Sequence, residues 1–382
     1  MTFTLAGPTL HPDGTIADAT IVVEAGVIAA VTPGADRRAD FVAAGVIAAG
    51  FIDMQVNGAY GFDFTTDGHT VADVAVRLPA TGVTAFVPTV ITSLWETYAD
   101  RLREVREGRR AAAGAEVLGV HLEGPYLSPR RPGAHNPAHL RPVDVAEIVR
   151  WADPSLVRIV TLAPELPAGL DAIRALTAQG ILVSAGHSEA SFAQALSGFA
   201  AGIGWGTHLY NTMAALGHRE PGLAGALLTS SVPCGLIADG VHCHPAMVRL
   251  AYRAKGAEGL TLVTDAVAAM GMPAGRYILG GREVIVDAAT SRLADGRLAG
   301  SILTMDQAVR NMIEFTGCSL AQALMMASTT PACVLGLARK GRIAAGCDAD
   351  LIVMDDALRV AQTWVGGKVA FPVTATSDGA HR

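Results

Sequence analysis

The strongest constraint on the fold is a series of apolar segments of strand length that alternate with helical patterns through the middle of the chain. Their apolar character is continuous, which is typical of strands that are covered on both faces. Alternation of this kind predicts a (β/α)8 TIM-like barrel of parallel strands, in the α/β class. The predicted strands are residues 46–58, 82–90, 116–124, 157–165, 181–188, 202–211, 234–242 and 259–266.

The two ends of the chain have a different character. Residues 1–45 contain short alternating segments separated by turns, and residues 342–371 repeat that pattern. Such alternation predicts short, half-buried strands. We therefore expect a small β-sandwich domain built from both termini, residues 1–48 and 341–382, beside a metal-dependent hydrolase barrel of residues 49–340.

Composition narrows the class of partners. A hydrophobic content of 51% supplies a large core, and a net charge of -6 without any basic run argues against nucleic acid or an anionic membrane as a partner. Residues 190–217, the least charged region, predict a buried helix followed by a strand, because glycines interrupt what could otherwise span a membrane. The start of the chain lacks a signal-peptide pattern and the 5 cysteines are scattered. We therefore expect a cytoplasmic protein.

Polar side chains recur where the predicted strands end. Glu123, His187, His208 and Asp265 each close a different apolar segment. Chemistry in a parallel barrel sits at the C-terminal strand ends, so these four side chains should converge. One carboxylate and two imidazoles suit a catalytic divalent metal, and a further carboxylate could act as a base. The alternative for each residue alone is that it caps its own strand.

A further β segment follows the last predicted strand. Residues 276–301 alternate in character and contain turns at 280–281 and 295–296. This pattern predicts an inserted hairpin whose end, 299–301, walls the site. Helices are expected at 305–315 and 320–328.

In their order and joint presence, these segments resemble the N-acetylglucosamine-6-phosphate deacetylases of the amidohydrolase superfamily. The resemblance covers nearly the whole chain, and the order of the motifs is far more specific than any one of them. The motifs that carry it are HLEGPYL (121–127), GAHNP (133–137), AGHS (185–188), THLYNTM (207–213), HREPG (218–222), IADGVH (237–242), VTDA (263–266) and LAGS (298–301).

The resemblance implies one divalent metal per subunit, bound by Glu123, His187 and His208, with zinc expected and iron as the alternative. Many superfamily members have His-x-His after the first strand for a second metal. Gln55 and Asn57 stand there in this chain, so we expect a single metal and ordinary hydrogen bonding by these two amides.

Two catalytic roles follow from the same resemblance. Asp265 would take a proton from the attacking water and pass it to the departing amine, and it could also cap the next helix. His135 would polarise the acetyl carbonyl and stabilise the oxyanion.

The implied reaction is hydrolysis of N-acetyl-D-glucosamine 6-phosphate to D-glucosamine 6-phosphate and acetate, in amino-sugar catabolism or cell-wall recycling. Arginine suits the phosphate because its planar guanidinium donates in pairs. In related enzymes some phosphate contacts cross a subunit interface, which implies a homodimer or a dimer-based assembly. The implied substrate-binding residues are Ala134, His135, Asn211, Thr212, Arg219, His242, Leu298, Ala299 and Gly300.

Three alternatives stay open at this point. The substrate could be a related amino-sugar phosphate such as N-acetylgalactosamine 6-phosphate, because epimers can share these motifs. The chain could also be a catalytically silent oligomeric scaffold. Finally, His242, Cys243 and His244 offer three possible ligands for a second metal. Neighbouring residues on a strand point to opposite faces, so His242 and His244 could share a face while Cys243 could not, and phosphate binding is the preferred interpretation.

Overall fold

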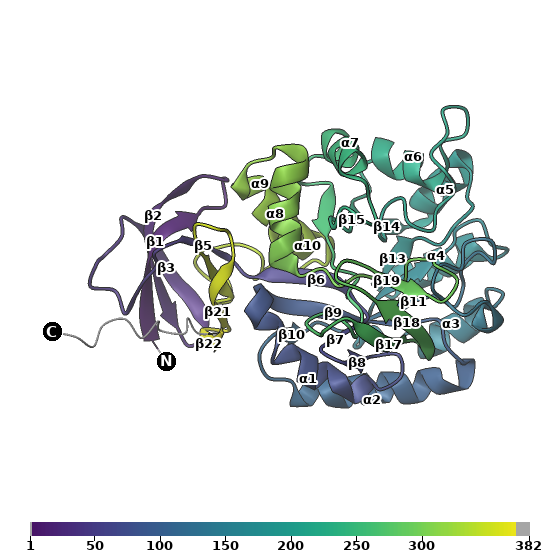
Figure 1. Cartoon of the computed structure of the whole chain (residues 1–382), viewed down its shortest axis with the longest axis horizontal. Coiled ribbons are helices and arrows are strands. Elements are labelled where there is room, and N and C mark those ends of the chain that lie inside the picture. Colours follow the sequence, from purple (N-terminus) through teal and green to yellow (C-terminus); the bar gives the residue numbers. More distant parts are fainter. Residues whose placement is uncertain (1, 372–382) are drawn as a thin grey trace.

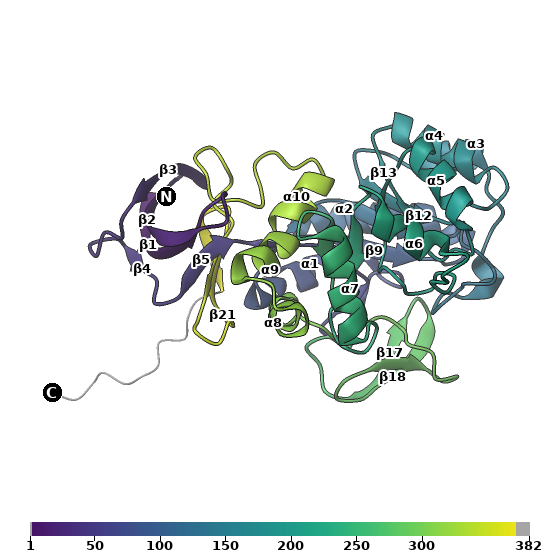
Figure 2. The same cartoon turned by 90° about the horizontal axis from the view of Figure 1, so that it is seen from above.

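A computed structural model describes residues 2–371 of the chain. A larger barrel and a smaller β domain lie side by side, and the small domain contains the first and the last described strands (Figures 1 and 2).

The larger part is a parallel barrel, as the sequence predicts. Its strands follow the order β6-β9-β11-β12-β13-β14-β15-β16. The ring closes where the ends of β16 and β6 meet, because Asn57 N donates to Ala266 O at 2.8 Å and Asp265 N donates to Gln55 O at 2.9 Å. The strand bounds are β6 Phe51–Val56, β9 Val83–Ile91, β11 Val120–Glu123, β12 Val157–Leu162, β13 Leu182–Ala185, β14 Ile203–Gly206, β15 Cys234–Leu236 and β16 Leu260–Leu262, and β10 Glu116–Val117 pairs with β9 alone.

Burial explains why these strands read as continuous apolar runs. Every residue of β6 and β9 is buried, because the core fills the inside of the barrel and helices cover its outside. The α-helices are α1 Val71–Ala75, α2 Tyr98–Ala111, α3 Val145–Trp151, α4 Gly169–Ala178, α5 Phe192–Ala201, α6 Gly222–Thr229, α7 Pro245–Lys255, α8 Met305–Thr316, α9 Leu320–Ala327 and α10 Thr329–Val334. Short 3-10 helices are Gly68–Thr70, Leu78–Thr81, Trp95–Thr97 and Pro137–His139.

The prediction of a buried helix within residues 190–217 is wrong for α5. This helix begins with a capping box formed by Ser191 and Gln194, but only Ala195 and Gly198 are buried and Leu196 is 43% exposed. The segment lacks charge because it is rich in small residues, and small residues cost little to expose. Absence of charge was therefore a poor guide to burial here.

Strands from both ends of the chain form the small domain, also as predicted. They share one sheet of order β22-β21-β20-β5-β1-β2-β3, with β4 beside β1. Its buried cluster joins Phe3 and Ile21 from the start of the chain to Leu351 and Trp364 from the end. Predicted boundaries at 48 and 340 stay predictions. The strands are β1 Thr2–Leu10, β2 Ile16–Glu24, β3 Val27–Pro33, β4 Phe41–Val42, β5 Val46–Ala49, β20 Leu351–Met354, β21 Val360–Val365 and β22 Lys368–Phe371.

The inserted segment has three antiparallel strands, β17 Gly275–Leu279, β18 Arg282–Val286 and β19 Ser291–Leu293. We call it the hairpin insert, and β17 and β18 project from one side of the barrel in Figure 2. Its apolar side packs on Ile91 and Val267. Asp63, at the end of the small β7 (Gly58–Ala59) and β8 (Phe62–Asp63) pair, accepts a hydrogen bond from Gly280 N at 2.7 Å. These contacts fix the hairpin insert to the barrel.

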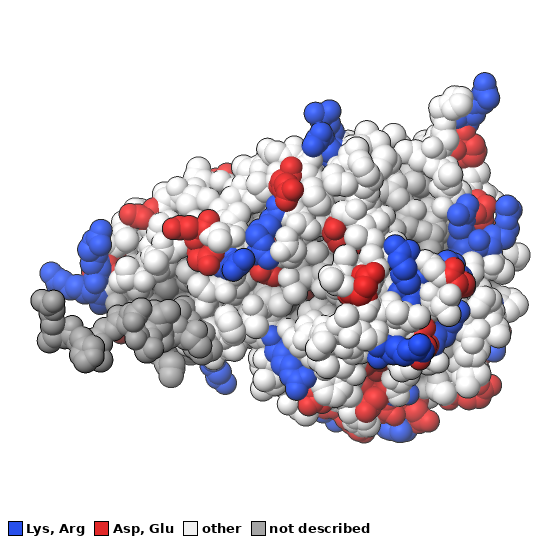
Figure 3. Space-filling view, viewed as in Figure 1, with Lys and Arg blue, Asp and Glu red and all other residues white. Residues whose placement is uncertain are grey.

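Charged residues of both signs are interspersed over the face shown in Figure 3, without a continuous basic area on the described part of that face. Between residues 2 and 371, no helix combines the length and the apolar character needed to cross a bilayer.

Candidate active site

The candidate site residues lie directly after barrel strands. Glu123 is the last residue of β11, and His187, His208 and Asp265 follow shortly after β13, β14 and β16. Backbone φ angles at these last three are +49°, +25° and +49°. Left-handed backbone is uncommon for residues other than glycine, and it concentrates at functional sites. The structure therefore brings together all four residues that the strand ends predicted.

Three ligand atoms meet at one point in the barrel mouth. Glu123 Oε1 lies 3.0 Å from His208 Nε2 and 3.3 Å from His187 Nε2, and the two Nε2 atoms are 3.1 Å apart. Ligands about 2.0–2.2 Å from a shared zinc ion stand about 3.3 Å from one another in a tetrahedral arrangement. His187 Nδ1 donates to Arg131 O at 3.0 Å, which leaves the Nε2 lone pair free to bind a cation. These residues fit a divalent metal.

Ionisation in this cluster also suits a cation. Burial lowers the pKa of His187 to about 4, so its imidazole is neutral and able to bind a metal at neutral pH. Burial raises the pKa of Glu123, but the adjacent imidazoles of His135, His187 and His208 outweigh the effect of burial and bring that pKa well below its usual range. The cluster therefore presents a buried negative charge.

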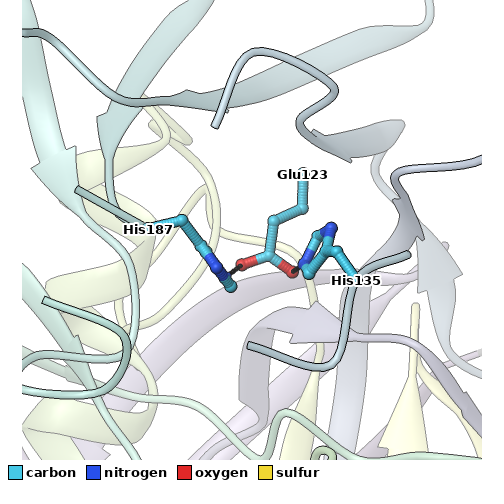
Figure 4. Close-up of side chains that lie close together, drawn as sticks. All are labelled: Glu123, His135 and His187. Atoms are coloured by element: carbon cyan, nitrogen blue, oxygen red, sulfur yellow. Dashed lines mark ion pairs between the residues drawn. The ribbon is translucent and has the colours of Figure 1, made fainter. Parts of the chain in front are cut away.

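His135 stands on the other side of the same carboxylate (Figure 4), with its Nε2 3.6 Å from Glu123 Oε2. Its Nδ1 accepts a hydrogen bond from the backbone N–H of Thr92 at 3.3 Å and lies 2.8 Å from Thr92 Oγ1. Since a backbone N–H can only donate, Nδ1 must be the acceptor, and the proton of the neutral ring is on Nε2. His135 can therefore donate a hydrogen bond into the site.

Two amides hold the carboxylates, as expected for Gln55 and Asn57. Gln55 Nε2 donates to Glu123 Oε1 at 3.1 Å, and Asn57 Nδ2 donates to Asp265 Oδ1 at 2.7 Å. Burial, together with the negative charge of Glu123, raises the pKa of Asp265 to about 6. A carboxylate with such a pKa can both accept and return a proton near neutral pH.

These groups open into a cavity of about 260 Å³. Asp265 and the three candidate metal ligands line its floor together with Asn57. The predicted substrate-binding residues that line it are Ala134, His135, Asn211, Thr212, His242, Leu298 and Gly300.

Two predicted substrate-binding residues lie elsewhere. Ala299 is fully buried in the apolar cluster under the hairpin insert. Arg219 is exposed, on the loop between β14 and α6, and it is not among the residues that line the cavity. Arg219 can therefore meet a substrate in this cavity only after a rearrangement or from a second copy of the chain.

His242 is oriented by a carboxylate. Its Nδ1 donates to Asp239 Oδ2 at 2.6 Å, which leaves Nε2 free. Burial raises the pKa of Asp239, but the hydrogen bond and charge of His242 outweigh it and lower that pKa. The rival reading of a second metal is not supported, because Cys243 Sγ faces Leu209 O at 3.8 Å and His244 Nδ1 accepts from Ala246 N at 3.2 Å. These neighbouring side chains have separate partners.

Some lining residues were not predicted, namely Ile91, Gly133, Leu279 and Arg297. Gly133 and Arg297 directly precede predicted contacts, Ala134 and Leu298, so their position was a usable signal. No sequence signal marked Ile91 and Leu279 as cavity-lining residues, because an apolar residue in a strand is normally interpreted as part of the core.

Comparison with known proteins agrees with this geometry. A model of the amidohydrolase family matches residues 46–376. The chain is 44% identical over 344 residues to the N-acetylglucosamine-6-phosphate deacetylase of Bos taurus, covering 86% of this chain and 84% of the bovine protein. It is 39% identical over 371 residues to the N-acetylgalactosamine-6-phosphate deacetylase of Escherichia coli O157:H7, covering 94% of this chain and 97% of that protein.

A solved structure has the same fold. It is a mutant N-acetyl-D-glucosamine-6-phosphate deacetylase from Mycobacterium smegmatis in complex with N-acetyl-D-glucosamine-6-phosphate, with a TM-score of 0.91, 34% identity, and coverage of 97% of this chain and 99% of that one. With matches of this extent, the chain belongs to the amidohydrolase family, in its N-acetylglucosamine-6-phosphate deacetylase branch.

Proposed function

We propose that this chain hydrolyses the acetamide of N-acetyl-D-glucosamine 6-phosphate, releasing acetate and D-glucosamine 6-phosphate. The observation that carries the proposal is the convergence of Glu123 Oε1, His187 Nε2 and His208 Nε2 within 3.3 Å of one another. This cluster opens into the same cavity as Asp265, in a chain that closely resembles enzymes named for this reaction.

Glu123, His187 and His208 would hold the metal. A divalent cation bound there supplies Lewis acidity, which makes water a nucleophile near neutral pH and polarises the carbonyl. Zinc suits one carboxylate and two imidazoles, with iron as the alternative. The donors of Gln55 and Asn57 face Glu123 and Asp265, which supports one metal per subunit.

Asp265 carries the proton. Its carboxylate accepts a proton from the attacking water and donates it to the amide nitrogen as the C–N bond breaks, so that a neutral amine and acetic acid are formed. The acid then gives its proton to solvent or to the amine, which leaves acetate as the product. Asn57 fixes Oδ1 at 2.7 Å, which keeps the carboxylate in one orientation.

His135 stabilises charge on the carbonyl oxygen. Because Thr92 N donates to its Nδ1, the Nε2–H is available to the oxygen that becomes negative in the tetrahedral intermediate. Removing a single donor of this kind typically costs about a hundred- to thousandfold in turnover.

The sugar phosphate is bound by His242 and by main-chain groups of Asn211 and Thr212, which line the same cavity. His242 would donate to the phosphate through Nε2–H, with both ring nitrogens protonated and Nδ1–H bonded to the Asp239 carboxylate. Arg219 contributes from a second copy of the chain, so the active form is a homodimer. The five free cysteines suit a reducing, cytoplasmic location.

The test is acetate release from N-acetylglucosamine 6-phosphate and from the unphosphorylated sugar, by the wild type and Arg219→Ala. The wild type should prefer the phosphorylated sugar strongly, and Arg219→Ala should lose that preference. Removing the metal with a chelator should abolish activity, and adding zinc should restore it. Equal rates on the two sugars would overturn the phosphate assignment.

A second candidate substrate is N-acetylgalactosamine 6-phosphate, favoured by the 39% identity to an enzyme named for it. Comparing kcat/KM for the two epimers decides between them. Purified protein that contains no metal and releases no acetate would favour a silent scaffold.

A further inference from the structure

The loop that carries His135 is held from outside the barrel. Residues 128–136 run between β11 and the 3-10 helix at 137–139 and form one wall of the cavity. One side of this loop is tied to the barrel, because His187 Nδ1 donates to Arg131 O and Arg131 pairs with Glu189.

The other side is tied to the hairpin insert by two arginines. Arg297 Nη1 donates to Gly133 O at 2.6 Å, and Arg282 Nη1 donates to Ala134 O at 3.0 Å and to His135 O at 3.3 Å. Three consecutive carbonyls therefore accept hydrogen bonds from guanidinium groups. Ala134 also packs against the apolar cluster of the hairpin insert.

Both arginines are themselves fixed. Asp295 Oδ2 accepts from Arg297 Nε at 2.9 Å and from Nη2 at 2.6 Å, which leaves Nη1 for Gly133. Arg282 is the first residue of β18, just after the Gly280 N–H that Asp63 holds. Arg282 thus donates from the end of a fixed strand, whereas the side chain of Arg297 is 43% exposed and is oriented by its ion pair with Asp295.

We propose that Arg282 and Arg297 are positioning residues, which keep the Nε2–H of His135 at the carbonyl oxygen of the substrate by holding the backbone of residues 133–135. This inference rests on the proposed function for its catalytic consequence. The hairpin insert is then part of the catalytic apparatus as well as a wall of the cavity.

The test uses Arg282→Met, Arg297→Met and the double variant, which keep an unbranched stem and remove the guanidinium donors. Arg276→Met is the matched control, because Arg276 is on the same insert and pairs only with the exposed Glu283 in the part of the chain that is described. Hydrogen–deuterium exchange of residues 128–136 and steady-state kinetics are measured for each variant. Exchange should accelerate severalfold in the double variant and kcat should fall about tenfold or more, as expected when a reacting group moves by about 1 Å. KM should change less than about twofold, because the phosphate contacts are intact.

Three results would overturn the proposal. A raised KM with unchanged kcat would make these arginines substrate contacts. Exchange and kcat equal to those of the Arg276→Met control would leave them without a role. Should the double variant fail to fold, Arg282→Lys, which keeps the charge and one donor, must show a kcat between the wild type and Arg282→Met. Added guanidinium ion must also partly restore the kcat of Arg282→Ala. Failure of either overturns the inference. Exchange needs no substrate, so an inactive wild type would defeat the proposed function and leave the loop measurement intact.

Discussion

Hydrogen bonds at single residues decide which groups in the mouth of the barrel can give a proton and which can take one. His135 must carry its proton on Nε2, because Thr92 N donates to Nδ1. His187 presents a bare Nε2, because its Nδ1 donates to Arg131 O. Asp265 is an acceptor poised near pH 6 by burial. The two histidines are thus given opposite roles by backbone groups that no side-chain motif displays.

Replacing Asp265 with Asn tests the proton role. Asn has nearly the same shape and can still accept from Asn57, but it cannot take up a proton. We expect a bound metal content equal to that of the wild type and a kcat lower by about a hundred- to ten-thousandfold. Acetate release and elemental analysis on the same preparation measure both. Wild-type turnover in this variant would contradict the assignment.

The sequence patterns predicted which residues carry the chemistry better than they predicted the hydrogen-bond partners of those residues. Glu123, His187, His208 and Asp265 could be grouped because each ends an apolar run, and parallel strands deliver their ends to one rim. The orienting contacts of Thr92 and Arg282 depend on which loops meet above that rim. Contacts between loops have no periodicity in the sequence, so no local pattern predicts them.

Among the elements, the loop 128–136 is closely constrained by its neighbours. Gly133 has φ +57°, and a Cβ there would lie 2.7 Å from Thr212 Cγ2 and 3.0 Å from His187 Cε1. Glycine is therefore required both for the backbone conformation and for the close approach.

Gly133→Ala should lower kcat/KM at least tenfold, because the added methyl displaces His187 or the loop, and such shifts are costly in active sites. Gly14→Ala is the matched control, since Gly14 has φ +83° and nothing within 4 Å of an added Cβ. Both variants should lose about 1 kcal/mol of stability from left-handed strain. Equal activity in the two would show that the contact at Gly133 is unimportant. Thermal unfolding and acetate release provide the measurements.

The seam that closes the barrel holds a second buried carboxylate. Asp53, on β6, accepts hydrogen bonds from Thr264 Oγ1 at 2.6 Å and from Gln55 N at 3.2 Å. Burial raises the pKa of Asp53 to about 7, although these hydrogen bonds oppose the shift. In the unfolded chain the same group titrates near pH 4.

A pH effect on stability follows from that difference. Because the folded pKa lies above the unfolded one, the unfolded chain loses its proton first, so Asp53 contributes a loss of stability as pH rises from about 4 to about 7. Asn cannot ionise and can make similar hydrogen bonds. Hence Asp53→Asn should gain in melting temperature relative to the wild type as pH rises through this window, with chelator present in both samples. A difference in melting temperature between the two proteins that stays constant from about pH 4 to about pH 7 would contradict the raised pKa of Asp53.

For the whole molecule, the sequence was sufficient to predict a barrel and a β domain built from both termini. Uninterrupted apolar runs predict buried parallel strands, and alternating ends predict a separate sheet. The prediction that α5 is buried was wrong, because a lack of charge in a segment of small residues does not imply a core position. The third strand of the hairpin insert, β19, escaped notice because it spans only Ser291–Leu293, too short to show a period.

Arg219, which we propose as a phosphate contact, does not line the cavity of its own chain. It is exposed on the loop between β14 and α6 and does not line its own cavity, and that loop rises from the barrel next to α6 in Figure 1. Its neighbour Glu220 accepts from Phe192 N at 2.7 Å and Gly222 N at 3.0 Å, which fixes the base of the loop. The contact of Arg219 with a second copy therefore stays a proposal that needs its own test.

Mixing two variants that are each impaired on the phosphorylated sugar tests this arrangement. Asp265→Asn removes the proton carrier from its own cavity, and Arg219→Ala removes the phosphate contact that it would give to the partner. After unfolding and joint refolding of equal amounts, half of the dimers should be mixed, and one of the two cavities in each mixed dimer should have both groups. Activity should therefore return to about a quarter of the wild type, as expected for a two-fold symmetric dimer. Each variant refolded alone is the control. Sedimentation would confirm that the mixture contains dimers. If mixing then gives no gain in activity, Arg219 either acts within its own subunit or has no part in binding the phosphate.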